Sequence, residues 1–322
     1  MDVLSEVLTM IRLQSAVSFC PEMSAPWGIK VPAQGDRALF WVLSRGSCYL
    51  EVDGREAPVP LVGGDLVMLP HGTAHTLRDQ LQTPAVPLDQ LMREGRANGE
   101  THAPHHGGGK SALVSGYFKL NNCIASQLIA PLPPLIHIRA EGSQSVPWLE
   151  TMLRFLASES TSDAPGTQII RARLTDVLFI QTLRAFLAQI GEDEHSCEKK
   201  GGILRALADP QIGKALAVIH QQTEHPWTVA GLAERVNMSR TGFAVRFSKL
   251  AGITPLDYLT KWRMEKAGAL LLQGEGSLDE IAHRVGYESG AAFSKAFKRE
   301  MGILPGLYRK EQVGSVNSVL PR

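Results

Sequence analysis

The 322-residue sequence has few cysteines, and they do not form a recognisable metal-binding pattern. Cys20, Cys48, Cys123 and Cys197 include no C-x-x-C pair, which argues against the common cysteine-based zinc sites. No segment has the length and purity of a membrane-spanning helix, and the N-terminus lacks a basic-then-apolar signal pattern. We therefore expect a cytoplasmic protein with no membrane partner, whose cysteines remain thiols.

Net charge is also nearly absent, since 33 Lys and Arg stand against 32 Asp and Glu. The charges are unevenly distributed along the chain. Residues 201–322 contain 16 basic and 11 acidic side chains, whereas residues 1–200 contain 17 and 21. The mildly basic C-terminal part suits a partner with a phosphate backbone, and the acidic remainder does not.

The segment from Thr228 to Arg309 contains nearly the same pattern twice. The first half of the pattern recurs after 49 residues and the second half after 50. A change of one residue in this offset is tolerated only where the backbone turns. Each copy therefore predicts a helix, a tight turn, a second helix and a following segment marked by Gly and Pro. The matching pairs are Ala233/Ala282, Arg235/Arg284, Val236/Val285, Phe243/Phe293, Phe247/Phe297, Gly252/Gly302, Pro255/Pro305 and Tyr258/Tyr308.

Residue types at the predicted turns support this interpretation. Asn237 and Gly286 follow the first helix of each copy, and both types accept a left-handed conformation. Ser277, with Glu280 three residues later, fits a capping box. Further N-cap candidates are Thr228, Ser239 and Ser289.

This doubled helix-turn-helix closely resembles the AraC/XylS family of bacterial transcription regulators. The resemblance is carried by LAERVNMSRTGFAVRFSKLAGITPLDYL at 232–259 and IAHRVGYESGAAFSKAFKREMGILPGLYR at 281–309, the family's signature half. It covers roughly the last third of the chain. It implies a sequence-specific DNA-binding regulator with promoter DNA and RNA polymerase as partners, without enzymatic activity or cofactor.

The second helix of each copy is the predicted DNA reader, with its outward face opposite the Phe pair. Arg240 suits a guanine edge or a phosphate, Lys295 a base edge and Lys298 a phosphate, although each could be a solvated surface charge. The connecting helix, about Pro255–Gln273, would be roughly 27 Å long, which can place the readers in successive major grooves. The predicted DNA contacts are Ser239, Arg240, Thr241, Ala244, Val245, Ser289, Ser294, Lys295 and Lys298.

The N-terminal part has the pattern of short strands. From about Val17 to Leu77, short apolar runs are cut by Gly, Pro and Asp, which predicts an antiparallel sheet or barrel. Residues 64–75 fit G-x5-P-x-G-x2-H, so the region resembles the cupin barrel that many AraC-type regulators carry as a sensor. The first cupin motif, expected near 36–54, has Trp41 where a His is usual. Two metal ligands are missing, which favours a sensor over the alternative, a metal-dependent cupin enzyme or a metal- or redox-binding protein with an appended DNA-binding domain.

The sequence leaves three candidates for the effector of this sensor, and the first is a metal ion. His75, with His102, His105 and His106 of a predicted long loop at 79–110, could form a regulatory metal site or a lid, or could be exposed histidines without such a role.

The second candidate is an oxidant, because one subgroup of cupin-bearing regulators is thought to respond through two cysteines. Cys20 matches the first of these in rough position. The second cysteine is expected in a Cys-Gly pair on a late barrel strand, but this sequence has Ser115-Gly116 there, and the nearest thiol is Cys123. Cys20 could equally be inert. A small organic ligand, lined by Trp27, Trp41 and Tyr49, is the third possibility.

A helix predicted at Gln168–Ile190 is apolar over more than half its circumference, which predicts homodimerisation.

The strand pattern of the N-terminal part and the helical pattern of the rest together predict an α+β, multidomain fold. The predicted parts are a cupin-like barrel at 1–142, a helical dimerisation region at 143–190, a linker at 191–202, the double helix-turn-helix domain at 203–312 and a tail at 313–322.

Overall fold

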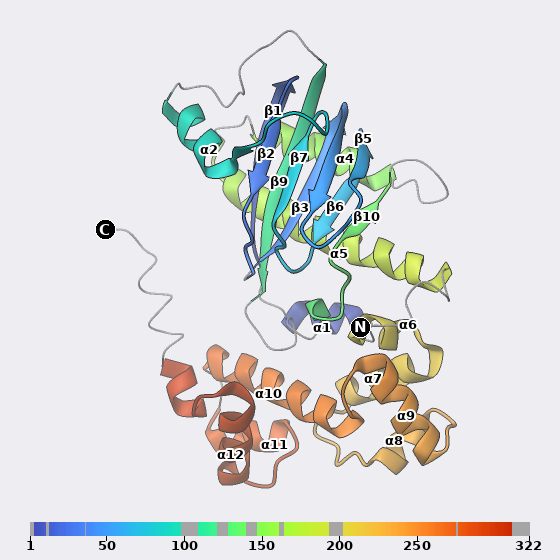
Figure 1. Cartoon of the computed structure of the whole chain (residues 1–322). Helices are drawn as coiled ribbons and strands as arrows, with labels where there is room; N and C mark the ends of the chain where they lie inside the picture. Colours follow the sequence, from blue (N-terminus) through green and yellow to red (C-terminus); the bar gives the residue numbers. More distant parts are fainter. Residues whose placement is uncertain are drawn as a thin grey trace. The chain divides into compact units, whose positions relative to one another are not determined.

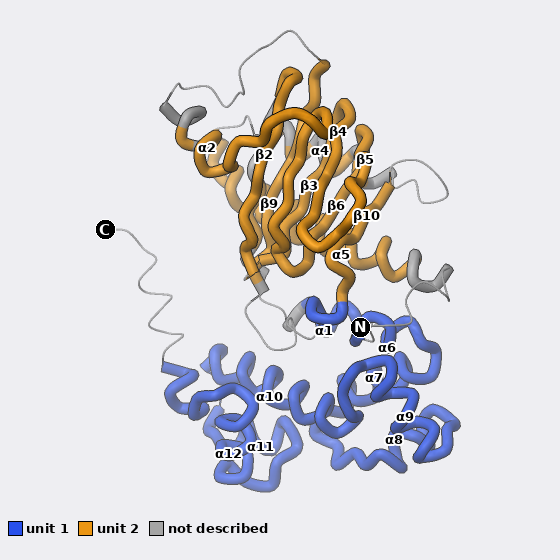
Figure 2. The backbone as a smooth tube through the Cα atoms, in the orientation of Figure 1, with its two compact units in different colours: residues 1–12, 121–131, 193–322 blue, residues 13–120, 132–192 orange. Residues whose placement is uncertain are grey.

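The protein consists of two compact units (Figure 2). The computed structural model describes residues 3–10, 13–35, 37–97, 109–120, 128–139, 147–160, 164–192, 202–274 and 276–310. Residues 1–12, 121–131 and 193–322 form one unit, here called the helical unit, and residues 13–120 and 132–192 form the other, the barrel unit. The predicted α+β, multidomain class is confirmed.

The described strands of the barrel unit form two five-stranded sheets, in the orders β1-β9-β3-β6-β10 and β5-β4-β7-β2-β8. Pairing is antiparallel apart from the parallel pair β2 and β8. The strands are β1 (Leu13–Ser24), β2 (Gly28–Val31), β3 (Ala38–Arg45), β4 (Ser47–Val52), β5 (Val59–Val62), β6 (Leu66–Leu69), β7 (His75–Arg78), β8 (Val86–Pro87), β9 (Lys110–Leu120) and β10 (Ile136–Ile138).

The barrel core forms because alternate side chains of each strand point inward. In β4, Cys48, Leu50 and Val52 are buried. The inward side chains of both sheets make one apolar cluster that includes Trp27 and Trp41. The core thus joins the two sheets, as expected for a cupin-like barrel.

Two helices, α4 (Pro147–Ser160) and α5 (Thr167–Glu192), lie against the sheet that contains β1 and β9 (Figure 1). Phe179 of α5 packs on Phe118, with ring centroids 4.8 Å apart, and Phe118 stacks on Phe40 at 5.0 Å. This aromatic row fixes α5 on the face of the sheet that points away from the barrel core. Helix α5 contains the helix predicted at Gln168–Ile190, and α4 lies within the predicted helical region at 143–190.

The segment 79–110 is not a loop throughout, contrary to the prediction from its polar composition. It contains β8 and a helix, α2 (Leu88–Ala97). Leu88 and Leu91, three residues apart and therefore on one helix face, pack against the barrel cluster. The polar composition of the segment gave no indication of this apolar contact. Residues 98–108 lie outside the described part.

The helical unit contains the two predicted helix-turn-helix copies, α8–α9 and α11–α12, joined by α10 (Figure 1). A short helix, α6, was not predicted. The helices are α1 (Val3–Met10), α6 (Ile203–Ala208), α7 (Pro210–Gln221), α8 (Val229–Arg235), α9 (Arg240–Ala251), α10 (Pro255–Gln273), α11 (Leu278–Arg284) and α12 (Gly290–Met301).

The N-terminal helix α1 groups with the helical unit, whereas the predicted boundaries assigned it to the barrel at 1–142. It contacts α7 and α10, and Val7 is fully buried. The spacing of apolar residues in a sequence does not indicate which neighbour a helix covers. Most of the predicted linker at 191–202 and the tail at 313–322 lie outside the described residues.

Candidate nucleic-acid interface

The first reader helix, α9, is held by its caps and by a buried aromatic pair. Ser239 Oγ accepts a hydrogen bond from Gly242 N over 3.1 Å, and α9 ends at Gly252, whose φ is 78°. Phe243 and Phe247 are fully buried, with ring centroids 5.7 Å apart. Because these two rings face inward, the opposite side of α9 is directed to solvent.

The predicted contact residues lie on that solvent-facing side of α9. Arg240 and Thr241 are exposed, Ala244 is half-buried and Val245 is 64% exposed. An apolar side chain this exposed, beside an arginine, offers both a methyl surface and a hydrogen-bond donor to the edges of base pairs.

The second reader helix, α12, repeats the arrangement. Ser289 Oγ accepts from Ala292 N over 3.3 Å, and Phe293 and Phe297 are fully buried. On the outward side Ser294 is half-buried, and Lys295 and Lys298 are exposed.

The turns before both readers have the backbone that the sequence predicted. Asn237 and Gly286 adopt positive φ angles of 54° and 79°. Ser277 and Glu280 form the complete capping box at the start of α11. An interaction that was not predicted holds the start of α12, where Gly290 N donates to Asp279 Oδ1 over 2.7 Å.

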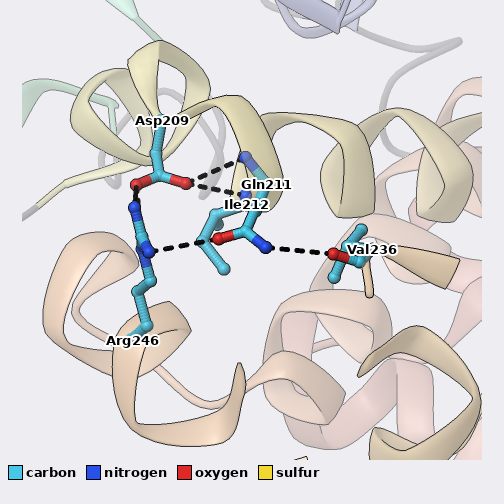
Figure 3. A network of polar contacts seen from close by, with 5 residues as sticks. All are labelled: Asp209, Gln211, Ile212, Val236 and Arg246. Atoms are coloured by element: carbon cyan, nitrogen blue, oxygen red, sulfur yellow. Dashed lines mark hydrogen bonds and ion pairs between the residues drawn. The ribbon is translucent and has the colours of Figure 1, made fainter. Parts of the chain in front are cut away.

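A polar network fixes α9 against α7 (Figure 3). Asp209 caps α7 through Oδ1, which accepts from Gln211 N at 3.0 Å and Ile212 N at 2.9 Å. Its other oxygen, Oδ2, accepts from Arg246 Nε at 3.0 Å and Nη2 at 2.6 Å. One carboxylate therefore links the N-terminus of α7 to the reader helix.

Gln211 extends the network to α8. Its Oε1 accepts from Arg246 Nη1 over 3.2 Å, and its Nε2 donates to Val236 O, at the end of α8, over 3.1 Å. Burial raises the pKa of Asp209, but the hydrogen bonds from Ile212, Arg246 and Gln211 outweigh this effect and lower it below its ordinary value. The carboxylate is thus ionised near neutral pH and keeps its ion pair with Arg246.

The connection between α7 and α10 is a buried aromatic stack around His220. Its ring lies 3.5 Å from that of Trp262, nearly parallel, and its Nε2 is 2.7 Å from Tyr258 Oη. Burial raises the pKa of Tyr258, so the phenol keeps its proton and its O–H donates a hydrogen bond to His220 Nε2. Burial, and next the charge of Lys266, lowers the pKa of His220 to about 3, even though the carboxylate of Glu6 in α1 lies 3.2 Å from its Nδ1.

In the barrel unit, His75 occupies the end of the cupin-like motif but is fully engaged by protein groups. Trp41 Nε1 donates to His75 Nε2 over 2.7 Å, and His75 Nδ1 lies 2.8 Å from Thr73 O. Because Nε2 accepts, Nδ1 carries the proton and donates to Thr73. Burial lowers the pKa of His75, so the ring is neutral at physiological pH. No group of three potential metal ligands occurs within the described parts of the chain.

The other predicted effector residues are dispersed. Trp27 is 5% exposed and belongs to the barrel core with Trp41, whereas Tyr49 points outward and is 36% exposed, so it does not line the interior. Strand alternation gives the reason, because the neighbours of Tyr49, Cys48 and Leu50, face inward.

Most of the predicted cysteine and histidine sites lie outside the part of the chain that the structure describes. Burial raises the pKa of Cys48 to about 12, which agrees with a buried hydrophobic role. Cys20 lies in β1, opposite Leu113, but its side chain is outside the described set. Cys123, His102, His105 and His106 also lie outside the described residues.

Comparison with known proteins identifies the family. Residues 2–188 match a family model described as cupin, and residues 232–311 match one described as a helix-turn-helix domain. A Streptomyces lividans protein named as an AraC-like transcription regulator is 34% identical over 314 residues, which cover 96% of this chain and 98% of that protein. The chain belongs to the AraC family of transcription regulators.

Two further relatives, both named as transcription regulators, match nearly the whole chain. The transcriptional regulator AlkR of Acinetobacter baylyi is 32% identical over 320 residues, covering 97% of this chain and all of AlkR. The RCS-specific activator RclR of Escherichia coli is 28% identical, with 96% and 98% coverage. Among solved structures, the DNA-binding domain of AdpA in complex with a target DNA is 33% identical over 32% of this chain and 93% of that one, with a TM-score of 0.31.

The AraC-family regulator is thus a DNA-binding protein with a cupin domain, and not an enzyme. Among the described helices, none combines the length and apolarity needed to cross a membrane. Sequence reasoning overlooked Asp209, Gln211, Arg246 and Asp279, which hold the reader helices. Only Asp209 had a recognisable signal, since Asp followed by Pro210 is typical of a helix N-terminus.

Proposed function

We propose that α9 and α12 enter successive major grooves on one face of promoter DNA and read it through their solvent-facing side chains. The observation that carries this proposal is the equivalence of the two helices. Each has a capped N-terminus, an inward Phe pair and an exposed polar face. The connecting helix α10 has 19 residues and spans about 27 Å, a length that can place the readers in successive major grooves about 34 Å apart.

The two readers differ in chemistry, which supports different roles. In α9, Arg240 can donate two hydrogen bonds to guanine, while Thr241, Ala244 and Val245 offer methyl groups that suit thymine. In α12, Lys295 faces the bases and Lys298 the phosphates, with Ser294 immediately before Lys295 in the sequence. Ser239 and Ser289, at the helix N-termini, lie where phosphate oxygens meet backbone N–H groups.

The protein acts as a homodimer through α4 and α5. The support comes from large apolar side chains that are exposed on these helices, including Phe155 at 57% and Ile169 at 68%. Ile170 and Val177 are exposed on α5 as well. A regulator of promoters works where the chromosome lies, so we place it in the cytoplasm, with RNA polymerase as a further partner.

The barrel unit controls DNA binding in response to an effector. A small organic molecule is supported by Trp27, which is buried and whose Nε1 has no hydrogen-bond partner among the described residues. This N–H would donate to an acceptor on the ligand. An oxidant acting on Cys20 is the second class, with Cys123 as the thiol nearest in the sequence to Ser115-Gly116, where the second cysteine of the resembled subgroup would lie.

The test is selection of genomic fragments by the purified full-length protein, with and without hypochlorite, followed by footprinting of the enriched promoters. We expect two protected major-groove segments one helical turn apart. Protein that shows no preference for any fragment over bulk competitor DNA, in reducing and oxidising conditions alike, would contradict the proposal. A change in occupancy only after oxidation would favour the cysteine class of effector, and Cys20→Ser should then abolish that change.

A further inference from the structure

The two helix-turn-helix copies are connected by more than α10. The segment between α7 and α8, residues 222–228, belongs to the first copy, and the turn at Gly286 and Tyr287 belongs to the second. Arg263, in the middle of α10, contacts both. Its side chain therefore lies at the junction of the two halves of the DNA-binding region.

On the first copy, Arg263 binds three consecutive carbonyl groups. Its Nε donates to Thr223 O over 2.9 Å, its Nη2 donates to His225 O over 2.8 Å, and Glu224 O lies 3.5 Å from Nη2. A guanidinium presents a rigid, planar set of donors, so it can hold several carbonyls in one fixed geometry. The segment before α8 is thereby anchored on α10.

On the second copy, the same guanidinium lies against the turn before α12. Its Cζ is 5.8 Å from the centroid of the Tyr287 ring, and that ring contacts Phe293 of α12 edge-on at 6.1 Å. A Cβ placed on Gly286 would come within 2.5 Å of Arg263 Nη2 and 2.6 Å of Glu224 O. The two copies therefore approach each other so closely that the turn has no room for a side chain.

We propose that Arg263 is a positioning residue that sets the spacing between the two DNA half-sites, without contacting DNA itself. It fixes the first copy relative to Tyr287 and thus relative to α12. This inference rests on the proposed function, in which both readers bind one duplex face. If the link is removed, each copy still folds on its own core, but the distance and rotation between α9 and α12 become variable.

The experiment measures affinity for duplexes that carry the two footprinted half-sites with one or two base pairs added or removed between them. Each base pair shifts the second half-site along and around the helix axis. The wild-type protein should lose about tenfold in affinity, comparable to a mismatched base pair, at either side of its preferred spacing. Arg263→Ala should flatten this dependence to about threefold or less, while its affinity for each isolated half-site stays within about twofold of wild type.

Two further variants separate positioning from charge and from general damage. Arg263→Lys keeps the positive charge but loses the planar fork, so it should be as tolerant of spacing as Arg263→Ala. Arg235→Ala is the matched control, because the guanidinium of Arg235 lies 5.8 Å from the ring of Trp227 within the first copy alone. This control should keep the sharp preference of the wild-type protein.

The outcomes are distinct. An unchanged spacing preference in Arg263→Ala would overturn the inference. Equal loss on every spacing and on each half-site, restored by Arg263→Lys, would also overturn it and make Arg263 a phosphate contact. If the wild-type protein itself showed no dependence on spacing, the two-groove proposal would fail, and the role of Arg263 with it.

Discussion

The indole of Trp41 donates its N–H to Nε2 of His75 over 2.7 Å, at the position in the barrel where a cupin enzyme would hold a metal. Nδ1 of the same histidine is 2.8 Å from Thr73 O. Both ring nitrogens are thus committed to the protein. The histidine that matches the cupin motif has a structural role, and the tryptophan that replaces the first-motif histidine provides its partner.

Trp41→Phe should destabilise the barrel unit by about 1–3 kcal/mol, because it leaves His75 Nε2 buried without a donor. Urea denaturation of the full-length protein measures this change. Tyr49→Phe, which alters an exposed ring on β4 in the other sheet, should change the free energy of unfolding by less than about 0.5 kcal/mol. Equal effects of the two substitutions would show that the hydrogen bond contributes no net stability.

The stability of the helical unit should decrease as the pH falls from about 6.5 towards 3. In the folded state His220 has a pKa of about 3, whereas its ordinary value is 6.5. Between these values the unfolded chain binds a proton that the folded one does not, so acidification favours unfolding. Above about pH 6.5 the stability that comes from keeping His220 neutral is fully present.

His220→Gln tests this pH dependence, because the variant cannot titrate. Its free energy of unfolding should be lower than that of the wild type at pH 7. Between pH 6 and 4 this free energy should depend less steeply on pH, by up to about 1.4 kcal/mol per pH unit. Tryptophan fluorescence during denaturation is a suitable measurement. His225→Gln, at an exposed position, is the control and should keep the wild-type slope. A slope unaltered by His220→Gln would argue against a neutral, buried ring.

Lys295→Ala should weaken binding to the selected operator by roughly 1–3 kcal/mol and relax its sequence preference. Lys298→Ala should instead weaken binding about equally on all sequences and reduce the salt slope by about 1. Lys214→Ala, on the exposed side of α7, is the control. Equal loss on operator and random DNA for Lys295→Ala would make Lys295 a phosphate contact.

Ile169→Glu should convert the protein to a monomer by placing a charge in the proposed dimer contact on α5. We expect the dimer to weaken by about 2 kcal/mol or more, measured by sedimentation at micromolar concentration. Leu81→Glu, at another exposed apolar residue of the barrel unit, outside α4 and α5, should leave the oligomeric state unchanged. A wild-type protein that sediments as a monomer would contradict the dimer itself.

The sequence predicted best what is determined locally. The caps at Thr228, Ser239 and Ser289 depend on residues three positions apart, and all three were identified. The left-handed turns at Asn237 and Gly286 depend on a single residue type.

Features that depend on distant residues could not be predicted in the same way. Arg246 pairs with a carboxylate 37 positions away and Arg263 with carbonyls 38 to 40 positions away, and no periodicity marks such contacts. The packing of α1 on α7 and α10 likewise joins residues that are far apart in the sequence. The outward direction of Tyr49, in contrast, follows from strand alternation and was available from the sequence.

The chain passes between its two units four times, after residues 12, 120, 131 and 192. A protease cut anywhere from 193 to 201 would therefore not yield a clean DNA-binding fragment. The N-terminal piece would retain α1, whose buried Val7 belongs to the helical unit and which contacts α7 and α10. The two pieces should elute together, and a C-terminal fragment expressed by itself would carry an uncovered apolar surface where α1 normally lies.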